Sequence, residues 1–124
     1  ETMGNVLKDD EIVSNIQVPR PPEGSLQKFI KFRLRESIDF AIVSIATLIE
    51  MDGERCNDAR IILGAVAPTP YRADYAEEVI KGKVLDEATI EDAAETAVSD
   101  SKPLSGNAYK VEITKTLVKR VLSG

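Results

Sequence analysis

Residues 38–67 read IDFAIVSIATLIE (38–50), MDGER (51–55) and CNDARIILGAVA (56–67), which is two apolar runs on either side of a short polar turn. The pair Asp52-Gly53 favours a β-hairpin, because glycine adopts positive φ without steric cost and Asp is common in such turns. Both runs are rich in Ile, Val, Leu and Thr, which favour strands. The stretch therefore predicts a long antiparallel hairpin at the centre of the fold.

Alternation along the two runs predicts which face of the hairpin is buried. The apolar face comprises Ala41, Val43, Ile45, Thr47 and Ile49 in the first run, and Ala59, Ile61, Leu63, Ala65 and Ala67 in the second. Alternation is incomplete, since Ile42, Ala46 and Leu48 are also apolar although they lie on the opposite face. We therefore expect helices on one face and partial cover of the other. A buried helical hairpin is the alternative, because short apolar runs do not separate strands from helices by period alone.

The flanking segments predict two more strands and three helices. Residues 11–18 alternate and are expected to form a first strand that ends at Pro19, and residues 26–35 form a second, with an apolar and a basic face. Helical spacing and end signals predict helices over 73–81, 86–99 and 107–122, with Asp86 and Asn107 as N-caps. Strands followed by helices indicate an α+β fold, in which an antiparallel sheet of three to four strands packs against three helices as a sandwich.

Length and composition suit one domain, with residues 1–10 as a flexible leader and 11–124 as the folded part. The formal net charge of −5 argues against a general nucleic-acid binder, which would have a basic surface. One cysteine excludes an internal disulfide and fits a reducing cytoplasmic setting. The sequence contains no apolar run long enough to span a membrane and no signal peptide pattern.

The residue inventory excludes several kinds of catalytic site. The chain has no His, which removes Ser-His-Asp catalysis and histidine metal ligands. A single Cys cannot build a cysteine-based zinc or iron–sulfur site, and Cys56 is expected to be an inert thiol. An independent hydrolase is therefore disfavoured, and we expect neither catalytic residues nor a metal site in this chain.

Three separated motifs, in one order, carry a family resemblance. They are KFRLRESIDFAIV (31–43), DARIILGAVAPTPYR (58–72) and AEEVIKG (76–82). Together they resemble the C-terminal domain of the FAD-binding (medium) subunit of molybdenum hydroxylases, the family of the carbon monoxide dehydrogenase flavoprotein and the xanthine dehydrogenase FAD subunit. The resemblance covers roughly residues 11–122, and it implies a small antiparallel sheet with three helices.

The resemblance also implies a function. In this family a substrate is oxidised at molybdopterin in a large subunit, and electrons pass through iron–sulfur clusters in a small subunit to FAD in the medium subunit. This domain would cover FAD and help to shape the subunit contact, as a non-catalytic part of an oxidoreductase. Its partners would be the FAD lobes of the same subunit and the molybdopterin and iron–sulfur subunits. The alternative is a non-catalytic interaction module that uses an α+β sandwich as a docking surface.

Cofactor-binding residues follow from the resemblance alone. The family's contacts with FAD map onto Ile12 and Val13 in the first predicted strand and onto Lys31 in the second. A lysine beside the flavin ring or its phosphates would stabilise negative charge there. The alternative readings are a solvated strand lysine for Lys31 and strand-core packing for Ile12 and Val13. The family's Gly-rich FAD lobes have no counterpart here, since Gly64 and Gly82 are isolated.

Two ion pairs are expected to support turns. Asp39 precedes the central run and is placed to pair with Arg35 or Arg33. Arg72 and Glu77 flank the start of the first predicted helix and are expected to pair there. Both pairs are interpreted as structural.

Overall fold

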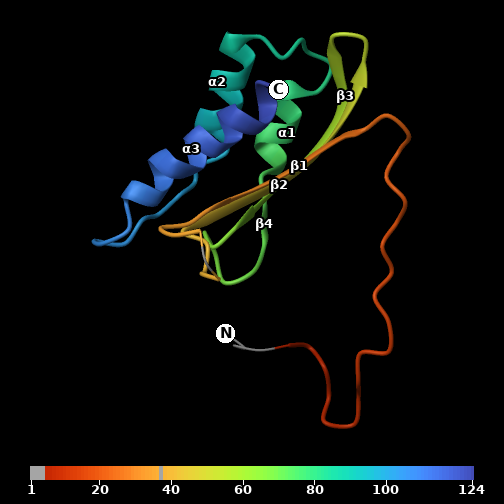
Figure 1. The fold of residues 1–124 in the computed structure, drawn as a ribbon, viewed down its shortest axis with the longest axis vertical. Coiled ribbons are helices and arrows are strands. Elements are labelled where there is room, and N and C mark those ends of the chain that lie inside the picture. The colour runs from red at the N-terminus through yellow and green to blue at the C-terminus, as the bar shows by residue number, and fades with distance from the viewer. Residues whose placement is uncertain (1–4, 37) are drawn as a thin grey trace.

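The computed structural model describes residues 5–36 and 38–124, which form one antiparallel sheet and a layer of helices. The strands β1 (Leu26–Phe32), β2 (Val43–Asp52), β3 (Arg55–Gly64) and β4 (Tyr71–Arg72) pair in the order β1-β2-β3-β4. They precede α1 (Asp74–Ile80), α2 (Glu87–Thr96) and α3 (Tyr109–Leu122). In Figure 1 these helices lie on one side of the sheet. The predicted α+β fold is confirmed.

The β2–β3 hairpin forms the centre of the sheet. Asp52 pairs with Arg55 across a turn in which Gly53 has a φ of 59°, the left-handed conformation that glycine adopts most readily. The hairpin prediction is confirmed, and the helical alternative is excluded. The first strand of the hairpin begins at Val43 rather than at Ile38. The residues just before Val43 belong to the connection from β1, and the Ile42 N–H donates to Phe32 O at 2.8 Å.

The core lies between the hairpin and the helices. On β2 and β3 the predicted apolar face is buried at Val43, Ile45, Thr47, Ile49, Ala59, Ile61 and Leu63. The helices bury apolar side chains against it, among them Ala76, Ile80, Ala93, Ala94, Leu117, Val118 and Val121. Three members of the predicted face are exceptions. Ala41 precedes β2 and is only half-buried. Ala65 and Ala67 follow the end of β3 and are exposed, because alternation sets a face only while the strand continues.

The predicted helix caps have different outcomes. Asp86 precedes α2, and its Oδ1 accepts a hydrogen bond from Thr89 N at 2.8 Å, so this cap is confirmed. The prediction that Asn107 caps the last helix is wrong. Its Oδ1 accepts from Leu104 N at 2.7 Å and closes a local turn, and α3 begins two residues later at Tyr109. Asn side chains readily form such turns in competition with a cap.

The prediction of a first strand over residues 11–18 is also wrong. The segment has no ladder partner, and Ile12, Ile16 and Val18 are exposed. Alternation selects the faces of a strand, but a strand forms only where a neighbour supplies the hydrogen bonds. In Figure 1 this segment leaves the start of β1 and runs away from the sheet on the side opposite the helices. The next strand, β1, ends at Phe32 rather than at Arg35.

The Arg72–Glu77 pair is confirmed and joins the sheet to α1. Arg72 Nη2 lies 2.8 Å from Glu77 Oε2, and the Glu77 side chain is buried. Glu77 Oε1 also accepts from Ile61 N at 2.8 Å, on the edge of β3 where the short β4 ends. The carboxylate therefore satisfies a strand amide that would otherwise lack a partner.

Candidate functional site

One face of the sheet carries no helix in the described residues, and we call it the open face. Its members are the strand residues whose parity is opposite to that of the core, namely Gln27, Phe29, Lys31, Ser44, Ala46, Leu48, Glu50, Asp58, Arg60, Ile62, Gly64 and Arg72. The helices contact the sheet through the other face, where the core residues lie. The open face is therefore a surface on which another body could sit.

Lys31 lies at one end of the open face, beside a flat strip of small residues. It pairs with Ser44, which in turn pairs with Gly64, so these three residues form one row across β1, β2 and β3. A Cβ built on Gly64 would collide with Ser44 Oγ. The missing side chain keeps the row low, so a planar group could approach the backbone closely next to the Lys31 ammonium.

The neighbouring row is apolar. Phe29 pairs with Ala46, and Ala46 pairs with Ile62. The Phe29 side chain is 68% exposed, although it lies in the middle of a strand. Phe29 lies on the edge strand β1, and with Ala46 and Ile62 it makes an apolar row that could serve as a contact surface. Together the two rows offer a flat, largely apolar area with Lys31 at one margin and Arg72, which pairs with Ile62, at another.

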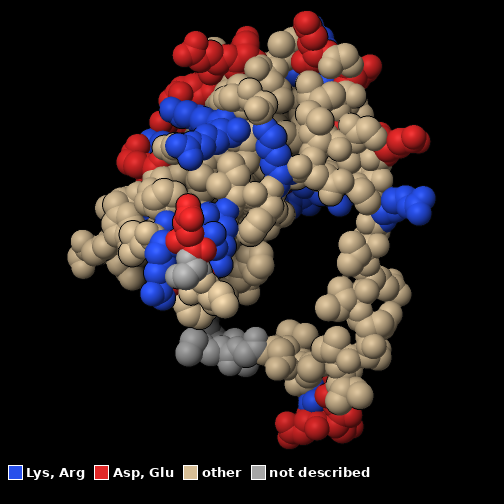
Figure 2. All heavy atoms as spheres, viewed as in Figure 1, with Lys and Arg blue, Asp and Glu red and all other residues tan. Residues whose placement is uncertain are grey.

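The connection from β1 to β2 adds further basic residues at the Lys31 end. Arg33 and Arg35 follow directly on Lys31, and all three are exposed. Arg35 Nε lies 3.3 Å from Asp39 Oδ2, which confirms the predicted pair. Arg33 and Lys31 form no ion pair with other described residues. In Figure 2 the blue side chains of this connection gather at the lower end of the body, beneath the helices.

The sequence-predicted cofactor residues are not brought together. Lys31 lies on the open face, whereas Ile12 and Val13 lie in the N-terminal segment and are 86% and 66% exposed. Figure 2 shows that segment standing off the body, with open space between them. The structure therefore provides a surface for Lys31 and leaves the assignment of all three residues to a cofactor as a prediction.

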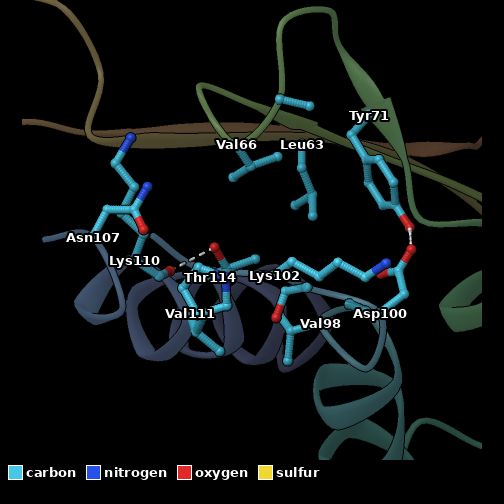
Figure 3. Close-up of a pocket in the computed structure, with 14 residues that line it drawn as sticks. Leu63, Val66, Tyr71, Val98, Asp100, Lys102, Asn107, Lys110, Val111 and Thr114 are labelled. Atoms are coloured by element: carbon cyan, nitrogen blue, oxygen red, sulfur yellow. Dashed lines mark hydrogen bonds between the residues drawn. The ribbon is translucent and has the colours of Figure 1, made fainter. Parts of the chain in front are cut away.

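A cavity on the helix side was not expected from the sequence. It has a volume of about 220 Å³ and lies between the β3–β4 loop, the α2–α3 loop and the start of α3. Tyr71 and Asp100 stand at one end of it and Lys110 at the other (Figure 3). These residues come from loops far apart in the sequence, so no local motif signals the cavity.

Cys56 and the acidic residues of the described part of the chain offer no cluster of metal ligands. Cys56 is fully buried, and burial, assisted by the charge of Asp58, raises the pKa of its thiol. A thiol with a raised pKa is a poor nucleophile. Within residues 5–36 and 38–124, no three Cys, Asp or Glu side chains cluster as metal ligands. In the same part of the chain, no helix is long and apolar enough to cross a membrane.

The chain is similar to a known protein family and to several of its members. The family model described as CO dehydrogenase flavoprotein C-terminal domain matches residues 28–124. The xanthine dehydrogenase FAD-binding subunit of Escherichia coli O157:H7 is 26% identical over 122 residues, which cover 94% of this chain and 42% of that protein.

Two solved structures share the fold. Quinoline 2-oxidoreductase from Pseudomonas putida 86 is 33% identical with a TM-score of 0.73, and the match covers 81% of this chain and 36% of that one. Carbon monoxide dehydrogenase from Hydrogenophaga pseudoflava is 28% identical with a TM-score of 0.79, over 86% of this chain and 38% of that one. The chain therefore spans about two fifths of the length of its relatives, 42% for the E. coli subunit.

Proposed function

The chain belongs to the CO dehydrogenase flavoprotein C-terminal domain family, and from this premise we propose that its open face covers FAD in an FAD-binding subunit of a molybdenum hydroxylase. Relatives in the family are oxidoreductase subunits, among them the FAD-binding subunit of xanthine dehydrogenase. The present chain contributes a cover for the cofactor and no catalytic residue.

The observation that carries the proposal is the juxtaposition of Lys31 with a flat, partly apolar strip. Lys31, Ser44 and Gly64 lie in one row, and Phe29 and Ala46 lie in the next. A flavin ring is planar, is largely apolar on its faces and carries polar atoms at its edge. The low strip suits a ring face, Phe29 supplies apolar contact, and the Lys31 ammonium suits the polar edge or a phosphate.

The residues of the open face fit the flavin ring of FAD but not its pyrophosphate. Tight pyrophosphate binding in proteins rests on Gly-rich backbone at helix N-termini. The glycine on the open face, Gly64, ends a strand and pairs with Ser44 instead. Other lobes of the subunit would therefore hold most of the FAD, which would supply the electron-accepting chemistry, while Lys31 and Phe29 would orient the ring and exclude water from it.

Ile12 and Val13 remain part of the proposed contact. Their segment leaves β1 on the side of the open face and is exposed along its length. In the complete subunit it would lie between the sheet and the neighbouring lobe, where Ile12 and Val13 would contact FAD through packing or backbone atoms.

The proposed partners follow from the relatives. The structure of the Hydrogenophaga enzyme is described as lacking the Mo-pyranopterin moiety of its molybdenum cofactor, so that enzyme uses a molybdenum cofactor. We place the present chain in a comparable assembly, in which electrons reach FAD from molybdopterin through iron–sulfur clusters in partner subunits. A single buried thiol at Cys56 suits the reducing cytoplasm that this placement implies.

The competing hypothesis is an interaction module that uses the open face to bind another protein. Exposure of Phe29 alone would fit either use. The two hypotheses differ in their predictions for FAD. If the open face only docks another protein, changes to its residues should not alter FAD binding.

Replacement of Lys31 by Met in the intact FAD-binding subunit tests the proposal. The Met side chain keeps much of the packing of the lysine stem and removes its charge. Because a charge-assisted hydrogen bond contributes roughly 1.5–3 kcal/mol, we expect FAD binding to weaken by roughly tenfold or more or the flavin midpoint potential to shift. Thermal stability should barely change, since Lys31 is exposed.

Lys28→Met is the matched control. Lys28 lies on the same strand and faces the helix layer, opposite Thr47. Its replacement should leave both flavin properties at the wild-type values. If the two variants behave alike, Lys31 is a solvated strand residue and leaves the proposed site.

A further inference from the structure

The walls of the cavity on the helix side are tied together by hydrogen bonds between residues far apart in the chain. Tyr71 Oη donates to Asp100 Oδ2 at 2.9 Å, which joins β4 to the α2–α3 loop. Lys110 Nζ donates at 2.9 Å to the carbonyl oxygen of Ala65, the residue directly before Val66, which lines the cavity. This second bond joins α3 to the β3–β4 loop. The cavity is therefore bounded by loops that the protein itself holds in place.

The side walls of the cavity are apolar. In Figure 3, Leu63 and Val66 lie on the side of the sheet, and Val98 and Val111 lie on the side of the helices. Leu63 belongs to the buried core, so the cavity reaches the edge of that core. An apolar body placed between these walls is removed from water on two sides, which favours its binding.

Polar groups gather at the end of the cavity where Tyr71 meets Asp100. In Figure 3 the Lys102 ammonium also lies at this end, beside the Asp100 carboxylate. One oxygen of that carboxylate accepts the Tyr71 hydroxyl, and the other forms no hydrogen bond within the described residues. Within residues 5–36 and 38–124, Lys102 forms no ion pair. This end therefore offers an acceptor and a donor side by side, with charges that offset each other.

The Tyr71 hydroxyl fixes the orientation of the acceptor. Burial of Tyr71, together with its hydrogen bond to Asp100 and the charge of that residue, raises the pKa of the hydroxyl above its ordinary value. The hydroxyl therefore keeps its proton at neutral pH and donates it to one oxygen of Asp100. The second oxygen stays available to a ligand.

We propose that this cavity binds a small neutral molecule that has one apolar ring and one hydroxyl or carboxamide group. The ring lies between the apolar walls, and the polar group donates to Asp100 and accepts from Lys102. A hydroxyl or carboxamide does both, whereas a carboxylate cannot donate and an ammonium cannot accept. A volume of about 220 Å³ suits one ring and excludes a nucleotide or a flavin. The site is independent of the proposed FAD contact, which lies on the other face of the sheet.

Benzyl alcohol is the probe that tests this inference, with benzoate and benzylamine as its charged counterparts. In ¹H–¹⁵N spectra of the protein titrated with each compound, benzyl alcohol should shift amides of the β3–β4 and α2–α3 loops in a saturable way. Each charged compound should bind more weakly by roughly threefold or more, because it loses one hydrogen bond and meets a like charge. Asp100→Asn should narrow the difference between benzoate and benzyl alcohol, since it removes the negative charge and keeps an acceptor for Tyr71.

A variant that fills the cavity locates the binding. Val66→Phe places a larger side chain at the cavity wall and should weaken the binding of benzyl alcohol by roughly tenfold or more. Val84→Phe is the matched control, because Val84 is 37% exposed against 38% for Val66 and does not line this cavity. It should leave the binding of benzyl alcohol unchanged.

Three results would overturn the inference. Benzoate or benzylamine binding as tightly as benzyl alcohol would show that the polar end does not select a neutral group. Equal binding by the Val66→Phe and Val84→Phe variants would show that the compound binds elsewhere. The absence of a saturable shift in wild-type protein would show that the cavity does not take a ligand of this class.

Discussion

Glu77 replaces a missing strand at the edge of the sheet. The sheet narrows at β4, which is two residues long, so β3 would present free backbone groups beyond it. Ala73 N donates to Ile61 O at 2.9 Å, and Glu77 Oε1 accepts from Ile61 N at 2.8 Å, so both groups of Ile61 on this edge are satisfied. Arg72 balances the buried carboxylate at 2.8 Å. One side chain thus fixes α1 against the sheet.

Glu77→Ala is expected to lower the free energy of unfolding by about 2–3 kcal/mol, because it leaves a buried strand amide and Arg72 without their acceptor. Urea unfolding measures the change. Glu78→Ala is the control, since Glu78 is exposed on the same helix, and its effect should stay within about 0.5 kcal/mol. Equal losses in the two variants would show that helix propensity, and not the bond to Ile61, sets the cost.

At the scale of the element, the start of α2 has a titrating cap. The Asp86 carboxylate accepts from Thr89 N at 2.8 Å, and this bond holds the pKa of Asp86 below its usual value. A folded-state pKa below the unfolded one adds stability above the unfolded value of about 3.9, and that stability is lost as pH falls through the folded value.

Asp86→Asn isolates this contribution, because Asn keeps an acceptor for the cap and does not titrate there. Unfolding free energies measured from about pH 6 down to about pH 3 should show the wild type losing stability relative to Asp86→Asn at the acidic end. If the two curves stay parallel throughout, the carboxylate makes no charge-assisted bond to α2.

The elements differ in how far the sequence specifies them. The hairpin follows from Asp52-Gly53 and two alternating runs, because turn chemistry and burial both depend on local sequence. Residues 11–18 alternate as well, yet they form no strand here, since pairing depends on a neighbour that alternation cannot supply. The prediction for Asn107 fails for a related reason, because its side chain accepts a hydrogen bond from Leu104 N rather than from an N–H of the helix.

The candidate surfaces were less predictable than the elements. Parity places Lys31 on a strand face, but only the family resemblance links it to a cofactor. The flat strip beside it depends on the register that sets Ser44 opposite Gly64, which no single segment encodes. The cavity depends on bonds spanning 29 residues, from Tyr71 to Asp100, and 45 residues, from Ala65 to Lys110.

At the scale of the whole molecule, the described residues, 5–36 and 38–124, cover the sheet on one face only. The helices bury the core face, whereas the open face exposes Phe29 and carries the basic connection that follows Lys31. A two-layer domain with an apolar strip in solvent is expected to gain its second cover from another body. We propose that this second body is FAD together with the lobes that hold it.

Thiol protection in the intact FAD-binding subunit tests this claim most directly. Phe29→Cys places a thiol on the open face, and Lys28→Cys places one on the opposite face of the same strand. The native Cys56 is fully buried and should not react. The account predicts that FAD slows maleimide labelling at position 29 by about tenfold or more and leaves position 28 unchanged. Equal labelling of position 29 with and without FAD would contradict the account.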